Sequence, residues 1–169
     1  MDTHAGDPPI EETVGDTLRA AGGTVAVAEG ATGGLVATLL TRLPGASDVF
    51  DRGYVTYGYD SLREVLAVSR ETLDEGGAVS APVAREMARA ARDRARTDWG
   101  LATAAIAGPK GGTADRPVGT AFVAVAEAAP WESGDSDAVA RRYEFDGSRE
   151  DIRERVARQA LSDLHEAVK

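Results

Sequence analysis

The sequence predicts an α/β fold, a three-layer α/β/α arrangement in which helices cover a mixed sheet of about five strands. Segments with helical spacing of apolar residues alternate with short runs of small and β-branched residues. Two of these runs end in glycine-rich loops, and the last two runs are close enough along the chain to form a hairpin. The sheet is therefore expected to combine parallel and antiparallel pairs.

The bulk composition limits the class of protein. The chain has 169 residues, of which 43% are hydrophobic, and it contains no Cys. This length suits one domain with a real core, and disulfides and thiolate metal sites are excluded. No apolar run reaches membrane-spanning length and no signal-peptide pattern opens the chain. We therefore expect no membrane partner and a cytoplasmic location.

The charge balance is strongly acidic, with a net charge of −9. Nucleic-acid binding relies on clustered Lys and Arg, so we expect no nucleic-acid partner. Of the 19 basic residues, only Lys110 and Lys169 are lysines. An acid-rich, lysine-poor composition is typical of proteins from a high-salt, halophilic cytoplasm, and we treat that origin as a hypothesis.

The elements follow from apolar spacing and from stop signals. Residues 1–9 are polar and aperiodic, so we expect a flexible tail, followed by a single domain over residues 10–169. The expected helices begin near Ile10, Leu35, Asp60 or Ser61, Ser80 and Ser148. The expected strands cover residues 24–28, 53–57, 101–107, 118–126 and 139–145. The segment around residues 75–77 is interpreted as a polar connection.

Individual residues mark several helix ends. Gly22 and Gly23 end the first helix. Ser80 is an N-cap followed by an early-helix proline, Pro82, and Ser148 with Asp151 forms a capping box for the last helix.

Two glycine-rich loops follow predicted strands, at residues 30–34 and 108–113. Neither matches the Walker pattern or the dinucleotide fingerprint. If both lie at one edge of the sheet, their backbone N–H groups form a rim suited to a phosphate or a carboxylate. Two ordinary tight turns are an equally good interpretation of these residues.

Candidates for catalysis are few. One histidine, His4, lies in the tail and the other, His165, near the carboxyl terminus, so a histidine-based triad is disfavoured and no spacing suggests a metal site. Glu29 is the best-placed carboxylate, although helix capping or ion pairing is the commoner role for such a residue. The hydroxyls near the loops are Thr32, Thr56, Tyr57 and Thr113. The residues alone predict a small-anion or nucleotide pocket without an obvious nucleophile and base.

A series of short motifs occurs in a set order along the chain. They are Ala-Glu-Gly-Ala-Thr-Gly-Gly at 28–34, Pro-Gly-Ala-Ser at 44–47, Gly-Tyr-Val-Thr-Tyr at 53–57, Gly-Ala-Val-Ser at 77–80, Ile-Ala-Gly-Pro at 106–109, Gly-Gly-Thr at 111–113, Arg-Pro-Val-Gly-Thr at 116–120 and Phe-Asp-Gly-Ser-Arg at 145–149. This order resembles the CinA carboxyl-terminal domain family, the nicotinamide-nucleotide amidases.

The resemblance implies an α/β domain, commonly a homo-oligomer, that hydrolyses the carboxamide of nicotinamide mononucleotide without a cofactor. The products are nicotinate mononucleotide and ammonia, in pyridine-nucleotide salvage. The family places a nucleophilic serine at the position of Gly30 and an activating lysine at the position of Leu62. Activation of a serine requires both groups, so we expect weak or absent activity. The alternative is a non-catalytic nucleotide-binding sensor or interaction subunit.

The resemblance and the loops together give a set of candidate site residues. For catalysis the candidates are Glu29, Thr32 and Tyr57, and Tyr57 is also suited to stacking on a pyridine or ribose. A core or interface aromatic is the alternative for Tyr57, and a surface arginine at a helix end is the alternative for Arg149. The expected phosphate-binding residues are Gly33, Gly34, Lys110, Gly111, Gly112, Thr113 and Arg149.

Overall fold

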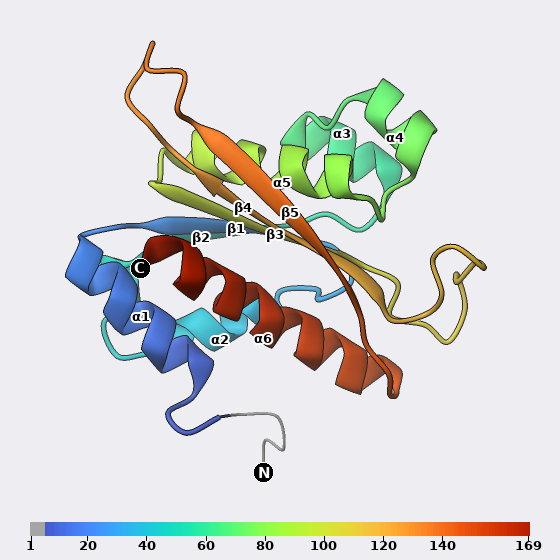
Figure 1. The fold of residues 1–169 in the computed structure, drawn as a ribbon, viewed down its shortest axis with the longest axis horizontal. Coiled ribbons are helices and arrows are strands. Elements are labelled where there is room, and N and C mark those ends of the chain that lie inside the picture. The colour runs from blue at the N-terminus through green and yellow to red at the C-terminus, as the bar shows by residue number, and fades with distance from the viewer. Residues whose placement is uncertain (1–5) are drawn as a thin grey trace.

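Short runs rich in Val and Ala build the centre of a mixed five-stranded sheet with helices on both faces (Figure 1). The computed structural model describes residues 6–169, so the first half of the expected tail lies outside the described residues. The strand order is β2-β1-β3-β4-β5. The strands are β1 (Val25–Glu29), β2 (Phe50–Val55), β3 (Trp99–Ala105), β4 (Thr120–Glu127) and β5 (Asp137–Glu144).

The direction of the strands explains where a site can form. β1 pairs in parallel with both β2 and β3, whereas β3–β4 and β4–β5 are antiparallel. The predicted hairpin of the last two strands is therefore confirmed. The carboxyl ends of β1, β2 and β3 lie side by side at one edge, which is where ligands bind in open α/β sheets.

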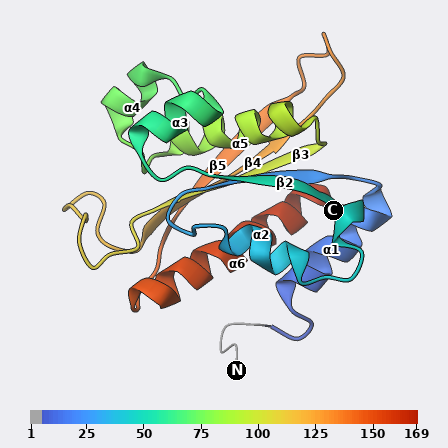
Figure 2. The same cartoon turned by 180° about the vertical axis from the view of Figure 1, so that it is seen from behind.

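Helices form a layer on each face of the sheet, as Figures 1 and 2 show from opposite sides. One layer contains α1 (Ile10–Ala21), α2 (Leu35–Thr41) and α6 (Arg149–Val168). The other contains α3 (Tyr59–Leu66), α4 (Arg70–Gly76) and α5 (Ala81–Ala95). A single 3₁₀ turn, η1 (Ala46–Asp48), precedes β2.

The alternation of side chains along β1 divides the core in two. Ala26 and Ala28 pack on the side of α5, whereas Val25 and Val27 pack among α1, α2 and α6. Small residues let α5 approach closely, and at Gly100 an added Cβ would lie 1.9 Å from the backbone oxygen of Ala88. On this face of the sheet, the backbone of α5 therefore lies directly against the backbone of β3 at Gly100.

Two expected elements differ from the structure by more than two residues at one end. Residues 70–76 form α4, where the sequence predicts no helix and a polar connection around residues 75–77. The helix forms because Ser69 accepts a hydrogen bond from the Thr72 amide (3.0 Å) and Leu73 is buried. β2 runs from Phe50 to Val55 rather than over residues 53–57. Pairing with β1 ends at Val55, opposite Glu29, and Tyr57 beyond it is 64% exposed.

The expected caps of the later helices are confirmed. The Ser80 hydroxyl accepts a hydrogen bond from the Val83 amide (3.5 Å). At α6, the Asp151 amide donates to the Ser148 hydroxyl (3.2 Å) and the Ser148 amide donates to the Asp151 carboxylate (2.9 Å). This capping box fixes where α6 begins, and hence where Arg149 lies.

His165 near the end of α6 gives the fold a pH dependence. Its Nδ1 lies 2.9 Å from the Thr17 hydroxyl, which itself donates to the Thr13 carbonyl (2.9 Å). Partial burial, with a smaller contribution from Lys169, lowers the pKa of His165. The folded protein therefore binds a proton less readily than the unfolded chain, so stability falls as the pH drops below about 6.5. We expect His165→Gln to reduce the loss of unfolding free energy between pH 7.5 and 5 in urea titrations; an unchanged slope would contradict this assignment.

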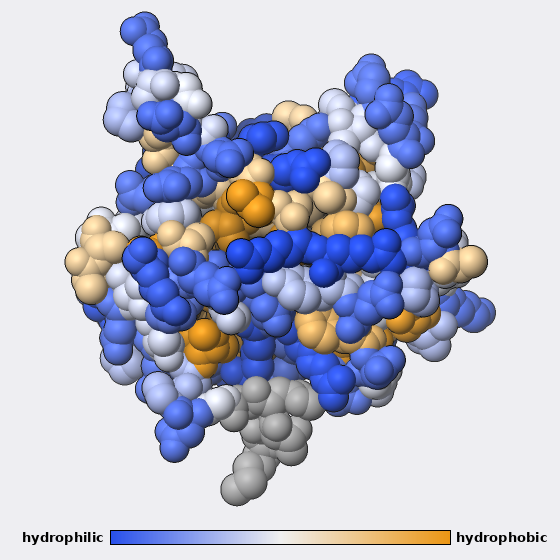
Figure 3. Space-filling model, in the orientation of Figure 1, coloured by the Kyte–Doolittle hydropathy of each residue, from blue (hydrophilic) through white to orange (hydrophobic). Residues whose placement is uncertain are grey.

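Hydrophilic side chains cover most of the face in Figure 3, and apolar residues show between the two helix layers. Within residues 6–169, none of the helices combines the length and the apolar character that crossing a bilayer requires.

Candidate functional site

A cavity of about 250 Å³ lies at the carboxyl ends of the three parallel strands. It is lined by residues that follow each strand, by the segment before α5 and by the first residue of α6. These residues are Gly30, Ala31, Thr56, Tyr57, Leu62, Ala78, Val79, Met87, Ala104, Ala105, Ile106, Ala107, Gly108, Lys110, Gly111 and Arg149. Part of each glycine loop therefore lines one cavity, which is the first of the two interpretations that the sequence left open.

The interior of this cavity is apolar and its mouth is basic. Leu62, Met87 and Ala104 are at most 4% exposed and form the inner wall. Lys110 and Arg149 are exposed at the mouth. No carboxylate of the described chain pairs with Lys110. Such a cavity suits a ligand with a flat apolar part and an anionic part.

Arg149 connects three elements at the mouth. Its guanidinium donates to the Gly108 carbonyl (2.6 Å) and to the Tyr57 hydroxyl (2.7 Å). The capping box places this residue at the first position of α6, so the side chain reaches the ends of both β2 and β3. Arg149 and Tyr57 thus form a fixed pair, with the guanidinium beside the opening of the cavity.

Glu29 and Thr32 do not line the cavity. The Glu29 carboxylate is 1% exposed and accepts hydrogen bonds from the Thr32 hydroxyl (2.7 Å), the Val36 amide (2.8 Å) and the Ala37 amide (3.1 Å). The Thr32 hydroxyl also lies 2.7 Å from that of Thr103. This geometry is that of a helix cap, because it satisfies amides that α2 leaves unpaired at its start.

The second half of the first glycine loop, Gly33 and Gly34, serves α2 rather than the cavity. Gly33 and Gly34 have φ angles of 60° and 98°, which favour glycine, and they lead directly into the helix. The amides at the start of α2 already bind the Glu29 carboxylate. The geometry does not bring these two glycines to the cavity, and their expected role in binding phosphate stays a prediction.

In the second glycine loop, some residues line the cavity and the others form a turn. Lys110 and Gly111 line the cavity. Thr113 closes a turn in which its hydroxyl accepts from the Arg116 amide (3.1 Å), and a Cβ on Gly112 would lie 2.7 Å from the Val118 nitrogen. Gly112 and Thr113 therefore hold the loop in shape, and their expected contact with phosphate stays a prediction.

Sequence reasoning left some cavity residues out of the candidate set. Ala78 and Val79 belong to a motif recognised before α5, and Met87 was assigned to the apolar face of that helix. The sequence feature that could have indicated these residues is the segment before the Ser80 cap. This segment brings the start of α5 to the ends of the strands. Thr56 belongs to the motif at residues 53–57, but its sequence context does not distinguish it from the other hydroxyls near the loops.

Thr56 is buried in the cavity wall, 2% exposed, and its hydroxyl oxygen has no hydrogen-bond partner in the described chain. The hydroxyls that line the cavity belong to Thr56 and Tyr57. The described lining includes no carboxylate and no imidazole. Among the usual proton-accepting side chains, the described lining therefore offers only those of Tyr57 and Lys110.

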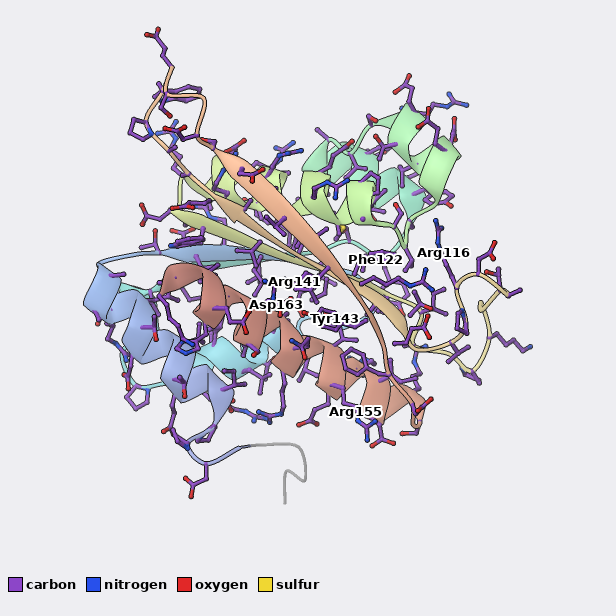
Figure 4. The ribbon with its side chains drawn as sticks, in the orientation of Figure 1. Arg116, Phe122, Arg141, Tyr143, Arg155 and Asp163 are labelled. Carbon is purple, nitrogen blue, oxygen red and sulfur yellow. The ribbon has the colours of Figure 1, made fainter. Side chains whose placement is uncertain are left out.

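A larger hollow of about 340 Å³ lies between β5 and the end of α6. Three of its charged groups contact one another. Arg141 donates to Glu166 (2.8 Å) and lies 3.8 Å from Asp163, which also accepts from Tyr143 (2.8 Å; Figure 4). The hydrogen bond from Arg141 lowers the pKa of Glu166, whereas burial raises that of Tyr143. This cluster stabilises the contact between β5 and α6.

The comparisons with known proteins agree with the fold and the motifs. The family model described as the CinA C-terminal domain matches residues 7–168. The chain belongs to this family. Among solved structures, the competence/damage inducible protein CihA of Agrobacterium tumefaciens is 37% identical, with a TM-score of 0.86 over 99% of both chains. A CinA superfamily protein of Enterobacter cloacae is 28% identical, with a TM-score of 0.88 over 100% of this chain and 96% of that one.

Two curated relatives each match more than nine-tenths of this CinA-family chain but differ in their own lengths. The nicotinamide-nucleotide amidohydrolase PncC of Escherichia coli K12 is 41% identical over 155 residues, which is 92% of this chain and 90% of the relative. A CinA-like protein of Geobacter metallireducens is 45% identical over 158 residues, 93% of this chain but 37% of the relative. The CinA domain here thus matches a small amidohydrolase almost end to end.

Proposed function

We propose that this CinA-family chain binds a pyridine nucleotide such as nicotinamide mononucleotide and hydrolyses its carboxamide much more slowly than amidase relatives do. The observation that carries the proposal is a cavity with an apolar interior and a basic mouth but without a paired nucleophile and base in its wall. The ring enters the interior, and the phosphate lies at the mouth beside Lys110 and Arg149.

The cavity and a relative support the substrate class. A volume of about 250 Å³ is somewhat below the range of roughly 300–1,000 Å³ for whole drug-sized ligands, so it suits the ring portion of a nucleotide. A guanidinium and an ammonium at the mouth are the groups that bind phosphate. The name of a relative with 41% identity states that it acts on nicotinamide nucleotides.

The composition of the wall supports slow chemistry. Gly30 and Leu62, the positions of the serine and the lysine in the family, both line the cavity and carry neither a hydroxyl nor an amine. The other catalytic candidates do not replace them, because the Thr32 hydroxyl and the Glu29 carboxylate are buried and bound to each other. Tyr57 remains, with its hydroxyl bound to Arg149.

A purely non-catalytic binding subunit, within a homo-oligomer, is the second candidate. Three large side chains between the end of β2 and the start of α3 favour it, since Val55, Tyr57 and Tyr59 are each more than half exposed. Such a surface is typical of contacts between proteins.

Two measurements on the wild-type protein test the proposal. Titration calorimetry is expected to show binding of nicotinamide mononucleotide, and an ammonia assay is expected to show release far below that of an amidohydrolase relative measured in parallel. Absence of binding would remove the nucleotide site. Ammonia release equal to that of the relative would contradict the loss of chemistry, whereas binding with no release would favour the second candidate.

Replacing Arg149 tests where the phosphate binds. We expect Arg149→Met to weaken binding of nicotinamide mononucleotide by about 10- to 30-fold, because a charge-assisted contact with phosphate is lost. Binding of nicotinamide riboside, which has no phosphate, is expected to change much less. The matched control is Arg155→Met on the same helix, where the guanidinium contacts the Asp146 carbonyl away from the cavity. Equal losses for both ligands would contradict the assignment.

A further inference from the structure

The Thr56 hydroxyl is a buried polar group without a partner. Thr56 directly follows β2, and its amide donates to the Glu29 carbonyl (3.0 Å), so its backbone is fixed beside the end of β1. The residue is 2% exposed, and its oxygen is shielded from water with no hydrogen bond to the described chain. Native proteins rarely leave such a group unpaired, so the Thr56 hydroxyl calls for a partner from outside the chain or for another specific explanation.

The neighbours of Thr56 show what kind of partner is missing. The buried part of the cavity wall is otherwise apolar, with Leu62, Met87 and Ala104 among its residues. The cationic groups, Lys110 and Arg149, lie at the exposed mouth. A ligand that fills the cavity therefore meets one neutral hydroxyl inside and positive charge only outside.

We propose that the Thr56 hydroxyl forms a hydrogen bond with the carboxamide of the bound ring, an inference that rests on the proposed function. Thr56 is then a specificity-determining residue. A threonine hydroxyl has one donor hydrogen and two acceptor lone pairs, and a carboxamide has both an acceptor oxygen and donor hydrogens. An uncharged amide also enters an apolar interior at a far lower desolvation cost than a carboxylate. The interior thus selects the amide over the corresponding acid.

Two substitutions separate the hydroxyl from the shape of the side chain. Thr56→Val has nearly the same shape but no hydroxyl, and Thr56→Ser retains the hydroxyl. Calorimetry would compare nicotinamide mononucleotide with pyridine mononucleotide, which has the same ribose phosphate and no carboxamide. We expect Thr56→Val to weaken binding of the first ligand by about 10-fold and Thr56→Ser by less than about 3-fold. Binding of pyridine mononucleotide is expected to be the same in all three proteins.

Thermal unfolding shows whether the hydroxyl serves the fold instead. Since the oxygen has no partner in the described chain, we expect the Tm of Thr56→Val to equal that of wild type or to exceed it by about 2–4 °C. A clear decrease in Tm would assign the hydroxyl to the folded structure and overturn the proposal.

Each binding result supports or overturns the assignment. Wild-type affinity of Thr56→Val for nicotinamide mononucleotide overturns it and leaves the proposed function standing. Equal weakening for both ligands, or equal weakening in the Val and Ser variants, also overturns it. If the wild-type protein binds neither ligand, the proposed function fails and the role of Thr56 fails with it.

Discussion

A Gly30→Ser/Leu62→Lys variant is expected to release ammonia from nicotinamide mononucleotide at least about 100-fold faster than the wild-type protein. The two changes restore a hydroxyl and an amine that the cavity wall lacks at these positions. A hydroxyl is a weak nucleophile until a neighbouring group takes its proton, and removal of either member of such a pair costs several orders of magnitude in rate. The pair acts as a unit, so each single variant is expected to gain little.

The backbone can accept both side chains. A Cβ on Gly30 would lie 3.3 Å from the Thr103 carbonyl oxygen, a contact that a shift of a few tenths of an ångström relieves. Its φ angle is outside the left-handed region that would strain a serine. Leu62 is 4% exposed on α3 and lines the same cavity, so a lysine there extends along an existing wall.

The matched control is Gly30→Ser/Leu62→Met, which keeps a long apolar side chain and supplies no base. We expect it to behave like Gly30→Ser alone in the ammonia assay, with calorimetry confirming that nicotinamide mononucleotide still binds. A control as active as the Ser/Lys variant would show that Lys is not the activating group. A Ser/Lys variant that binds nucleotide but stays at the wild-type rate would show that more than this pair separates the chain from the amidases.

The sequence contained most of the fold because its local signals agree with its tertiary packing. The helix caps at Ser80 and Ser148 satisfy amides locally, so they can be recognised without knowledge of the rest of the chain. α4 was missed because its sequence is polar around one buried residue, Leu73, and ends in glycines. Its stability comes in part from Glu86 on α5, whose carboxylate accepts from the Ser69 amide and the Thr72 hydroxyl, and no local pattern reveals that contact.

The candidate site was predictable to the level of strand ends and not to the level of side chains. Parallel strands bring their carboxyl ends together, so the order of strands and glycine loops indicated where Lys110 and Gly111 would lie. Arg149 was a candidate only through the family resemblance, and all three residues line one cavity. Whether a side chain at a strand end faces the cavity or the neighbouring helix depends on packing. Glu29 and Thr56 illustrate both outcomes: the carboxylate turns to α2, and the hydroxyl lies in the cavity wall.

Removing the Glu29 carboxylate is expected to be the most destabilising of the substitutions considered. In Glu29→Ala, the Thr32 hydroxyl and the amides of Val36 and Ala37 lose their shared acceptor inside a buried region. Buried donors without partners each cost about 1–3 kcal/mol, so we expect the unfolding free energy in urea to fall by about 3–4 kcal/mol. Glu29→Gln retains an oxygen and should lose about half as much.

The matched control is Glu64→Ala, at an exposed position on α3, for which we expect a change within about 0.5 kcal/mol. The Glu29 series also separates two roles of the carboxylate. A helix cap predicts reduced stability with nucleotide affinity retained at temperatures where the variant remains folded. A carboxylate that activates water predicts the reverse for Glu29→Gln, namely wild-type stability with loss of whatever ammonia release the wild-type protein shows. The second pattern would show that Glu29 takes part in the reaction. It would contradict the geometry, in which the carboxylate oxygens contact α2 and Glu29 is not among the residues that line the cavity.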